Sequence, residues 1–168
     1  MLTYKKIDRK DVTEEMFKQI MAVENSTGSG YDEDIMREIW LTRDNNDNFA
    51  CFDNDKIVAH ISYNPKSKRR NGSIFMVNLT VLPEYRKRGI AQNLIYTATK
   101  YYIDNGYTLL TSVSVDKDNI PAVNLYQKVG FEIKDPICEA DEDDEQYIMD
   151  STLQNIKTTL EKILNKKQ

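Results

Sequence analysis

One segment, residues 77–91, constrains the fold of this chain more than any other. It begins as an apolar run that ends at Pro83, as a buried strand would. A basic turn around Gly89 follows, and apolar residues then recur at helical spacing as far as Gly106, a residue typical of helix ends. A strand that leads through a short turn into a helix presents backbone N–H groups and the positive end of the helix dipole. The segment therefore predicts a phosphate-binding turn, although an ordinary connection with solvated basic side chains shows the same pattern.

The composition is typical of a small soluble protein and disfavours several other classes of protein. At 168 residues, with a formal net charge of −4 and a pI near 5.1, the chain suits one soluble domain and argues against charge-driven binding of nucleic acid. Its two cysteines, Cys51 and Cys138, form no CxxC pair, and His60 is the only histidine. This usage is typical of a reduced, cytoplasmic protein and predicts no metal site. No apolar run approaches the ~20 residues that span a bilayer, so we expect no membrane partner.

Alternating periodicities predict a mixed chain of strands and helices without an internal repeat. We expect strands at residues 3–7, 49–52, 57–63, 74–82, 108–115, 131–133 and 147–149. We expect helices from Thr13 to a break at residues 26–30, over 32–42, from Ile90 to Gly106, over 119–129 and over 151–168. The last helix is amphipathic, and its apolar side would pack on its own chain or on a second subunit, as in a homodimer. The prediction is one domain, residues 1–168, that ends in this helix.

Two motifs resemble those of a known family. The pattern Leu79-x-Val81-x-Pro83-x-x-Arg86-x-x-Gly89-x-Ala91 resembles the acyl-CoA-binding motif of the GNAT superfamily of N-acetyltransferases. The stretch Asn119-x-x-Ala122-x-x-Leu125-Tyr126-x-Lys128-x-Gly130-Phe131-Glu132 resembles the second signature of that superfamily. The motifs occur in the family's order with a strand-like run between them, and the resemblance covers roughly residues 57–150.

The resemblance implies a fold and an activity. The fold would be an α+β arrangement, a mostly antiparallel mixed sheet of about seven strands flanked by helices, with an extra C-terminal helix. Alternation of strands and helices alone would instead predict a parallel, doubly wound sheet. The activity would be transfer of an acetyl group from acetyl-CoA to a primary amine of a small molecule, protein or peptide, by direct attack in a ternary complex. The acceptor and the preferred acyl chain stay open.

The resemblance also implies which residues act. The main chain of Leu79 and Val81 would pair with the pantetheine arm, and Arg86 would help to shape the phosphate turn. Tyr126 would be the general acid near the CoA sulfur, although helix spacing alone would make it a core aromatic. Asn119 would contact the cofactor and also cap its helix. The full predicted cofactor site is Leu79, Thr80, Val81, Arg86, Lys87, Arg88, Gly89, Ile90, Ala91, Gln92, Asn119 and Tyr126.

The general base is not assigned by the sequence. Many members of the superfamily carry a glutamate on the strand before the phosphate turn, but residues 73–82 contain no carboxylate. Other carboxylates are expected to be helix caps or solvated charges: Glu24, Asp32, Glu33 and Glu84. An imidazole works as a base near neutral pH, yet a lone histidine in a strand, such as His60, is more typical of a structural role. Deprotonation through a water chain is a further alternative.

Two charged segments have alternative interpretations, and two other functions are alternatives to acetyl transfer. The acidic run 139–145 would attract a cationic acceptor, and the basic residues Lys66, Lys68, Arg69 and Arg70 would touch a CoA phosphate, but both are more typical of solvated loops. Because the strand carboxylate is missing, a non-catalytic acyl-CoA-binding regulatory module is the alternative to an enzyme. A dinucleotide-binding oxidoreductase is disfavoured, since the turn lacks the Gly-x-Gly-x-x-Gly pattern.

Overall fold

The computed structural model describes residues 1–28, 30–67, 73–134 and 145–166. The acidic run 139–145, apart from Glu145, and the basic residues Lys68, Arg69 and Arg70 lie outside these ranges. The interpretations attached to those two segments therefore stay predictions.

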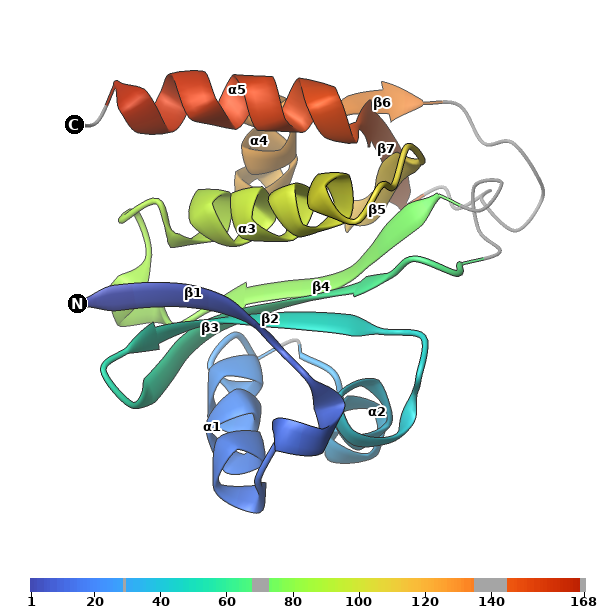
Figure 1. The fold of residues 1–168 in the computed structure, drawn as a ribbon. Coiled ribbons are helices and arrows are strands. Elements are labelled where there is room, and N and C mark those ends of the chain that lie inside the picture. The colour runs from blue at the N-terminus through green and yellow to red at the C-terminus, as the bar shows by residue number, and fades with distance from the viewer. Residues whose placement is uncertain (29, 68–72, 135–144, 167–168) are drawn as a thin grey trace. The chain divides into compact units, whose positions relative to one another are not determined.

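The described chain contains seven strands and five α-helices (Figure 1). The strands are β1 (Leu2–Ile7), β2 (Asp47–Asp53), β3 (Lys56–Asn64), β4 (Ile74–Val81), β5 (Leu110–Asp116), β6 (Glu132–Lys134) and β7 (Gln146–Thr152). The helices are α1 (Glu14–Asn25), α2 (Glu33–Arg37), α3 (Ile90–Asp104), α4 (Ile120–Lys128) and α5 (Leu153–Asn165). Short turns are η1 (Arg9–Asp11), the π-helical η2 (Glu38–Thr42) and η4 (Pro83–Tyr85).

The strands form one mixed sheet in the order β1-β2-β3-β4-β5-β7-β6. The β1–β2, β2–β3, β5–β7 and β6–β7 pairs are antiparallel, and β4 pairs with β5 in parallel through residues 74–76 and 111–113. The predicted mostly antiparallel seven-stranded sheet is therefore confirmed, and the doubly wound parallel sheet suggested by alternation is wrong. Because β7 lies between β5 and β6, the strand order departs from the chain order at this edge.

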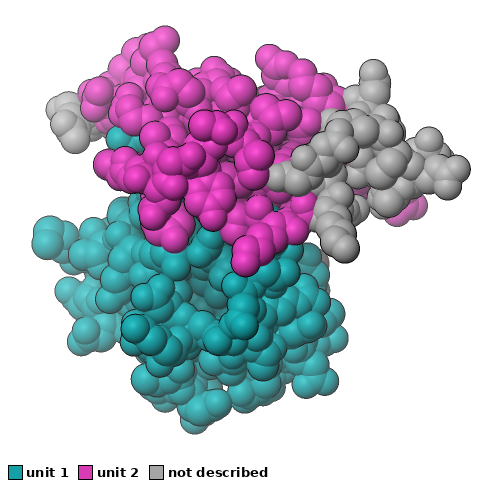
Figure 2. Space-filling view, turned by 45° about the vertical axis from the view of Figure 1, so that its right-hand side comes forward, with its two compact units in different colours: residues 1–64, 77–98 teal, residues 65–76, 99–168 magenta. Residues whose placement is uncertain are grey.

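The chain divides into two compact units, coloured separately in Figure 2. Unit 1 contains Met1–Asn64 and Val77–Ala98, and unit 2 contains Pro65–Met76 and Thr99–Gln168. The strand β4 and the helix α3 each pass from one unit into the other, but the segment that the sequence singled out, residues 77–91, lies entirely in unit 1.

In unit 1, α1 and α2 cover one face of strands β1 to β3 (Figure 1). The α1 helix begins where the Thr13 hydroxyl accepts a hydrogen bond from the Met16 N–H at 3.1 Å, as an N-cap does, and it packs against β3. The core is closely packed and contains the completely buried side chains of Trp40 and Phe49. The β2–β3 hairpin turns at Asn54, whose φ of 53° is tolerated well by asparagine.

In unit 2, α4 packs against β5 and α5 packs against β7. Apolar residues at helical spacing on α5, including Leu153, Ile156 and Leu160, are buried, as the amphipathic pattern predicts. The hydroxyl of Thr152 caps α5 by accepting from the Asn155 N–H at 3.1 Å. Ser151 and Asn155 both donate to the Gly130 carbonyl, which ties the end of α4 to the start of α5.

Two predicted elements differ in detail from the structure. The predicted helix over residues 32–42 is a short α2 that continues as the π-helical η2, and Asp32 is its N-cap. The strand β4 was expected to be buried on both faces, but only its first part is. Residues 74–76, which pair with β5, are buried, whereas Val77, Asn78, Leu79 and Val81 are half-buried.

Candidate active site

The turn between β4 and α3 has an unusual backbone. Pro83 ends the strand, and η4 then leads to Lys87 and Gly89, whose φ angles are 61° and 78°. A glycine adopts this left-handed conformation without strain, and turns that contain such residues form anion-binding concavities. The Gly89 carbonyl accepts the Asn93 N–H at 3.0 Å, so the helical bonding of α3 starts here. The N–H groups of residues 90–92 therefore have no partner inside the helix.

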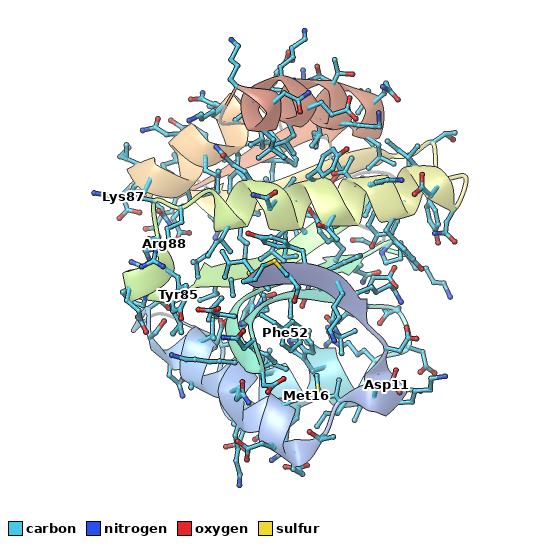
Figure 3. The ribbon with its side chains drawn as sticks, turned by 60° about the vertical axis from the view of Figure 1, so that its left-hand side comes forward. Asp11, Met16, Phe52, Tyr85, Lys87 and Arg88 are labelled. Atoms are coloured by element: carbon cyan, nitrogen blue, oxygen red, sulfur yellow. The ribbon has the colours of Figure 1, made fainter. Side chains whose placement is uncertain are left out.

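The electrostatics at this end of α3 favour an anion. No acidic residue lies in the first turn of the helix, so no side chain offsets the positive end of its dipole. Arg86, Lys87 and Arg88 are exposed on the turn, and Figure 3 shows Lys87 and Arg88 at the entry to α3. Among the described residues, no ion pair joins the Lys87 ammonium to a carboxylate. A phosphate group fits this combination of backbone and charge.

The two arginines also hold the turn in shape. The Arg86 Nε donates to the Val81 carbonyl at 3.1 Å, which fastens the turn to the end of β4. The Arg88 guanidinium donates to the Glu84 carbonyl at 2.8 Å and lies over the Tyr85 ring, 4.9 Å from its centroid. These contacts support the predicted shaping role of Arg86 and leave Lys87 as the cation best placed to meet a ligand.

Tyr85, which lies beside Arg88 in Figure 3, joins the turn to the β2–β3 hairpin. Its hydroxyl donates to Asp53 Oδ2 at 3.0 Å. This bond and the nearby N-terminal ammonium lower the pKa of the Asp53 carboxyl. The same bond, with burial and the charge of Asp53, raises the pKa of the Tyr85 phenol. Both groups are half-buried, and their bond fastens the turn to the β2–β3 hairpin.

The half-buried part of β4 lies directly before the turn. Leu79 and Val81 are the residues whose main chain was predicted to pair with an extended ligand. Residues 77–81 lie beyond the stretch that pairs with β5, and all of them except the buried Thr80 are half-buried. Their backbone is therefore the part of β4 best suited to bind a ligand in the manner of an added strand. The Thr80 hydroxyl points to the interior and donates to Glu24, so only its main chain is available for such pairing.

The α4 helix supplies the remaining predicted residues, which lie in unit 2. The Asn119 side chain caps α4 by accepting from the Ala122 N–H at 3.3 Å, as predicted. Tyr126 is buried, and its ring packs edge-to-face against Phe131 with centroids 5.7 Å apart. Burial raises the pKa of the Tyr126 phenol well above its ordinary value. The hydroxyl therefore stays protonated and can act as a proton donor, while the ring also fills the core.

Glu24 and His60 form a buried pair in unit 1 that sequence reasoning missed. The Glu24 carboxylate and the imidazole are 3% and 0% exposed, and His60 Nε2 lies 3.1 Å from Glu24 Oε2. The Tyr31 N–H donates to Glu24 Oε1 at 3.1 Å and the Thr80 hydroxyl donates to Oε2 at 3.0 Å. The expectation that Glu24 is a cap or a solvated charge is wrong, because α1 ends with this side chain turned toward β3 and β4.

The environment keeps Glu24 ionised. Burial is the largest single influence and favours the neutral acid, but the contact with His60, which is charged only when the imidazole is protonated, and the bonds from Tyr31 and Thr80 outweigh it. The net effect of burial and of these contacts is a lowered pKa of the Glu24 carboxyl. The other carboxylates behave as expected, since Asp32 caps α2 and Glu33 pairs with Arg37 on the surface.

Comparison with known sequences decides the family. The sequence model of the Acetyltransferase (GNAT) family matches residues 13–131, which is well over half of the chain. The chain belongs to this family. The resemblance to this family drawn from the two motifs is therefore confirmed.

Two kinds of relatives accompany this match. Over 86 residues the chain is 29% identical to the L-amino acid N-acetyltransferase AaaT of Escherichia coli K12, an alignment that spans 51% of this chain and 52% of that protein. The chain thus matches only about half the length of this relative. Among solved structures, the Escherichia coli ribosomal-protein-S18-alanine N-acetyltransferase superposes with a TM-score of 0.71 at 17% identity, covering 91% of this chain and 94% of that one. Arabidopsis thaliana NAA60 in complex with acetyl-CoA gives 0.70 at 15% identity, covering 92% and 99%. These structures confirm the fold.

The acetyltransferase thus carries its predicted site residues in two groups. Residues 79–92 form the turn and strand of unit 1, with Glu24 and His60 in the same unit, and Asn119 and Tyr126 lie on α4 in unit 2. The described residues contain no group of three metal-ligating side chains, and none of the described helices is long and apolar enough to cross a membrane. Sequence reasoning missed the Glu24–His60 pair. One feature of the sequence could have indicated a buried polar partner, namely the polar residues Asn78 and Thr80 on the otherwise apolar strand β4.

Proposed function

We propose that this acetyltransferase transfers the acetyl group of acetyl-CoA to a primary amine of a small molecule, protein or peptide by direct attack in a ternary complex. The observation that carries the proposal is the turn before α3. Its left-handed residues, its uncompensated helix N-terminus and its exposed Lys87 suit the pyrophosphate of acetyl-CoA. The half-buried backbone of Leu79 and Val81 suits the amide groups of the pantetheine arm.

The proposed roles follow the chemistry of amide formation. The main-chain N–H groups of residues 87–92 hold the pyrophosphate, and Arg86 keeps the turn in place through its bond to the Val81 carbonyl. The Leu79 N–H polarises the acetyl carbonyl, and Asn119 contacts the cofactor. Tyr126 is the general acid that protonates the departing thiolate, since its phenol carries a proton at neutral pH.

The nature of the acceptor is also part of the proposal. The relative AaaT is named for L-amino acids and the structural relative for the alanine of a ribosomal protein, and both names describe amine acceptors. We therefore place L-amino acids and N-terminal peptides first among candidate acceptors, followed by polyamines and amino sugars. We also propose that residues 1–168 form a single domain and that the protein is cytoplasmic, as the sequence predicts.

The test is release of CoA thiol from acetyl-CoA against a panel of these amines. We expect release with one amine class, and we expect Tyr126→Phe to lower kcat about 10–100-fold while acetyl-CoA affinity changes less than about threefold. The substitution removes the hydroxyl and keeps the ring contact with Phe131. Tyr107→Phe is the matched control, because its ring packs on Tyr102 in the same unit and has no assigned role.

Two results would count against the proposal. If Tyr126→Phe leaves kcat unchanged, Tyr126 is a core aromatic and another group protonates the thiolate. If acetyl-CoA binds but no amine on the panel is acetylated, the regulatory module is the better account of this chain.

A further inference from the structure

The Glu24–His60 pair poses a question of energetics. Placing a carboxylate in a protein interior is costly unless hydrogen bonds or an opposite charge compensate for the water that it loses. Yet the chain places this pair against β4, where Glu24 Oε2 accepts from Thr80 and from Asn78. These two residues flank Leu79, whose main chain is part of the proposed acyl-donor site. A functional role would explain why this charge is kept at this place.

Only one of the two polar atoms of the Asn78 side chain has a hydrogen-bond partner among the described residues. Its Nδ2 donates to Glu24 Oε2 at 3.4 Å, the longest of the bonds that the carboxylate accepts. The carboxylate sets the orientation of this amide, because the opposite orientation would place two acceptors face to face. The Oδ1 atom of Asn78 is buried and has no hydrogen-bond partner among the described residues. A buried acceptor without a donor is uncommon in folded proteins and indicates that a donor belongs there.

The missing donor must fit both acceptors. Glu24 is anionic, and Asn78 Oδ1 is a neutral acceptor on the amide that the carboxylate already contacts. A primary ammonium group carries a positive charge and three N–H donors and has no acceptor. It can therefore donate to Asn78 Oδ1 and replace the weak Asn78 bond to Glu24 Oε2. A quaternary ammonium carries the same charge but has no N–H to donate.

We propose that Glu24 and Asn78 bind the amino nitrogen of the acceptor and that the Glu24–His60 pair takes its proton. This inference rests on the proposed acetyl transfer to a primary amine, and it names the base that the sequence could not assign. Glu24 is the group that contacts the nitrogen. His60 acts through Glu24, since its Nε2 lies 3.1 Å from Glu24 Oε2.

The proton balance of the step is simple. One N–H bond of the ammonium breaks, and the proton passes to the pair, in which His60 becomes the imidazolium and Glu24 stays a carboxylate. The freed lone pair of the amine forms the C–N bond to the acetyl carbon, and the C–S bond of the thioester breaks. After the products leave, the pair returns its proton to solvent. Since Glu24 faces a cation in the protonated state, the interior then holds a neutral pair.

The surrounding residues fix the carboxylate in position. A Cβ at Gly30 would lie 2.7 Å from both Cγ and the carbonyl oxygen of Glu24, so only glycine fits against this side chain. Tyr31 contributes its N–H to Glu24 Oε1, and its hydroxyl donates to the Val77 carbonyl at 3.2 Å. Tyr31, in the connection between α1 and α2, is therefore bonded both to Glu24 and to β4. Tyr31 is 38% exposed and Asn78 is half-buried, so the fully buried Glu24 has two partners that reach toward the surface.

The binding part of the proposal is tested without turnover. His60 is the only histidine of the chain, so its ring ¹⁵N signals need no further assignment. We expect n-propylammonium to shift these signals in a saturable way in the wild type and in Glu15→Gln, a matched change on the exposed face of α1. We expect no shift with tetramethylammonium and none in Glu24→Gln. Asn78→Leu, which removes Oδ1 at a half-buried position, should also abolish the shift and serves if Glu24→Gln fails to fold.

The catalytic part is tested with the best acceptor from the panel. Glu24→Gln should lower kcat about 10²–10³-fold with the KM for acetyl-CoA unchanged, and Glu15→Gln should match the wild type. No ¹⁵N shift in the wild type, or an equal shift with tetramethylammonium, would overturn the nitrogen site. Full acetylation by Glu24→Gln would overturn its role as base while leaving the acetyltransferase function intact. A saturable shift without acetylation of any amine would support the nitrogen site and contradict the proposed function.

Discussion

At the scale of single residues, the Glu24 carboxylate has four polar partners in unit 1: Tyr31, His60, Asn78 and Thr80. Three of its partners lie far away in the sequence, since Asn78 and Thr80 are 54 and 56 positions away and His60 is on β3. A periodic sequence pattern relates only residues that are close together in the chain, so no such pattern could have revealed this cluster. By contrast, the caps at Thr13 and Asn119 bond to an N–H three residues on, and both were predicted correctly from local sequence.

The lowered pKa of Glu24 makes a prediction about stability and pH. In the unfolded chain this carboxyl titrates near its ordinary value of 4.5, and in the folded chain it titrates lower. Its contribution is therefore complete above the unfolded-state pKa and is lost as the pH falls through the folded-state pKa. Urea unfolding between about pH 6 and about pH 3 should show a smaller loss of unfolding free energy in Glu24→Gln than in the wild type.

An exposed carboxylate with a lowered pKa provides the control for this experiment. Glu14 pairs with Arg37 on the surface, where solvent and salt screen the interaction. Glu14→Gln should therefore follow the wild-type pH dependence closely. Parallel curves for Glu24→Gln and the wild type would mean that burial cancels the contacts that Glu24 makes.

At the scale of elements, the helices follow their sequence signals more closely than β4 does. The α1, α3 and α4 boundaries lie within a residue or two of the predictions, since caps, glycines and apolar spacing are local. The apolar run of β4 predicted a strand buried on both faces, but its second half is only half-buried. Apolar composition indicates that a segment avoids water, and it does not reveal whether a strand or a ligand covers it.

The cap of α5 makes a prediction at this scale. Thr152→Ala removes the hydroxyl that accepts from the Asn155 N–H and should lower the unfolding free energy by about 1 kcal/mol. Thr158→Ala makes the same substitution at an exposed position within α5 and should change it by less than about 0.5 kcal/mol, because alanine favours a helix interior. Chemical denaturation of both variants checks the difference, and equal effects would show that the cap adds nothing to α5.

At the scale of the whole molecule, the strand order is the feature that residue patterns could not supply. The hydrogen-bonded neighbours of β5 are β4 and β7, and the connection that leads from β6 to β7 includes residues 135–144, outside the described ranges. Such pairings depend on contacts between segments far apart in the chain. The sheet was predicted because two motifs together identified the family, and the family match over residues 13–131 confirms that inference. The same motifs did not identify the base, since Glu24 and His60 belong to neither.

The central claim is that the turn between β4 and α3 binds acetyl-CoA, and calorimetric titration tests it most directly. We expect one saturable site for acetyl-CoA in the wild type and no comparable binding of NAD. Lys87→Glu places a negative charge where a phosphate should lie and should weaken binding at least about tenfold, or roughly 1.4 kcal/mol. Lys18→Glu makes the same change of net charge on the exposed face of α1 and should leave the affinity within about twofold. No binding by the wild type, or equal weakening by the two variants, would contradict the account.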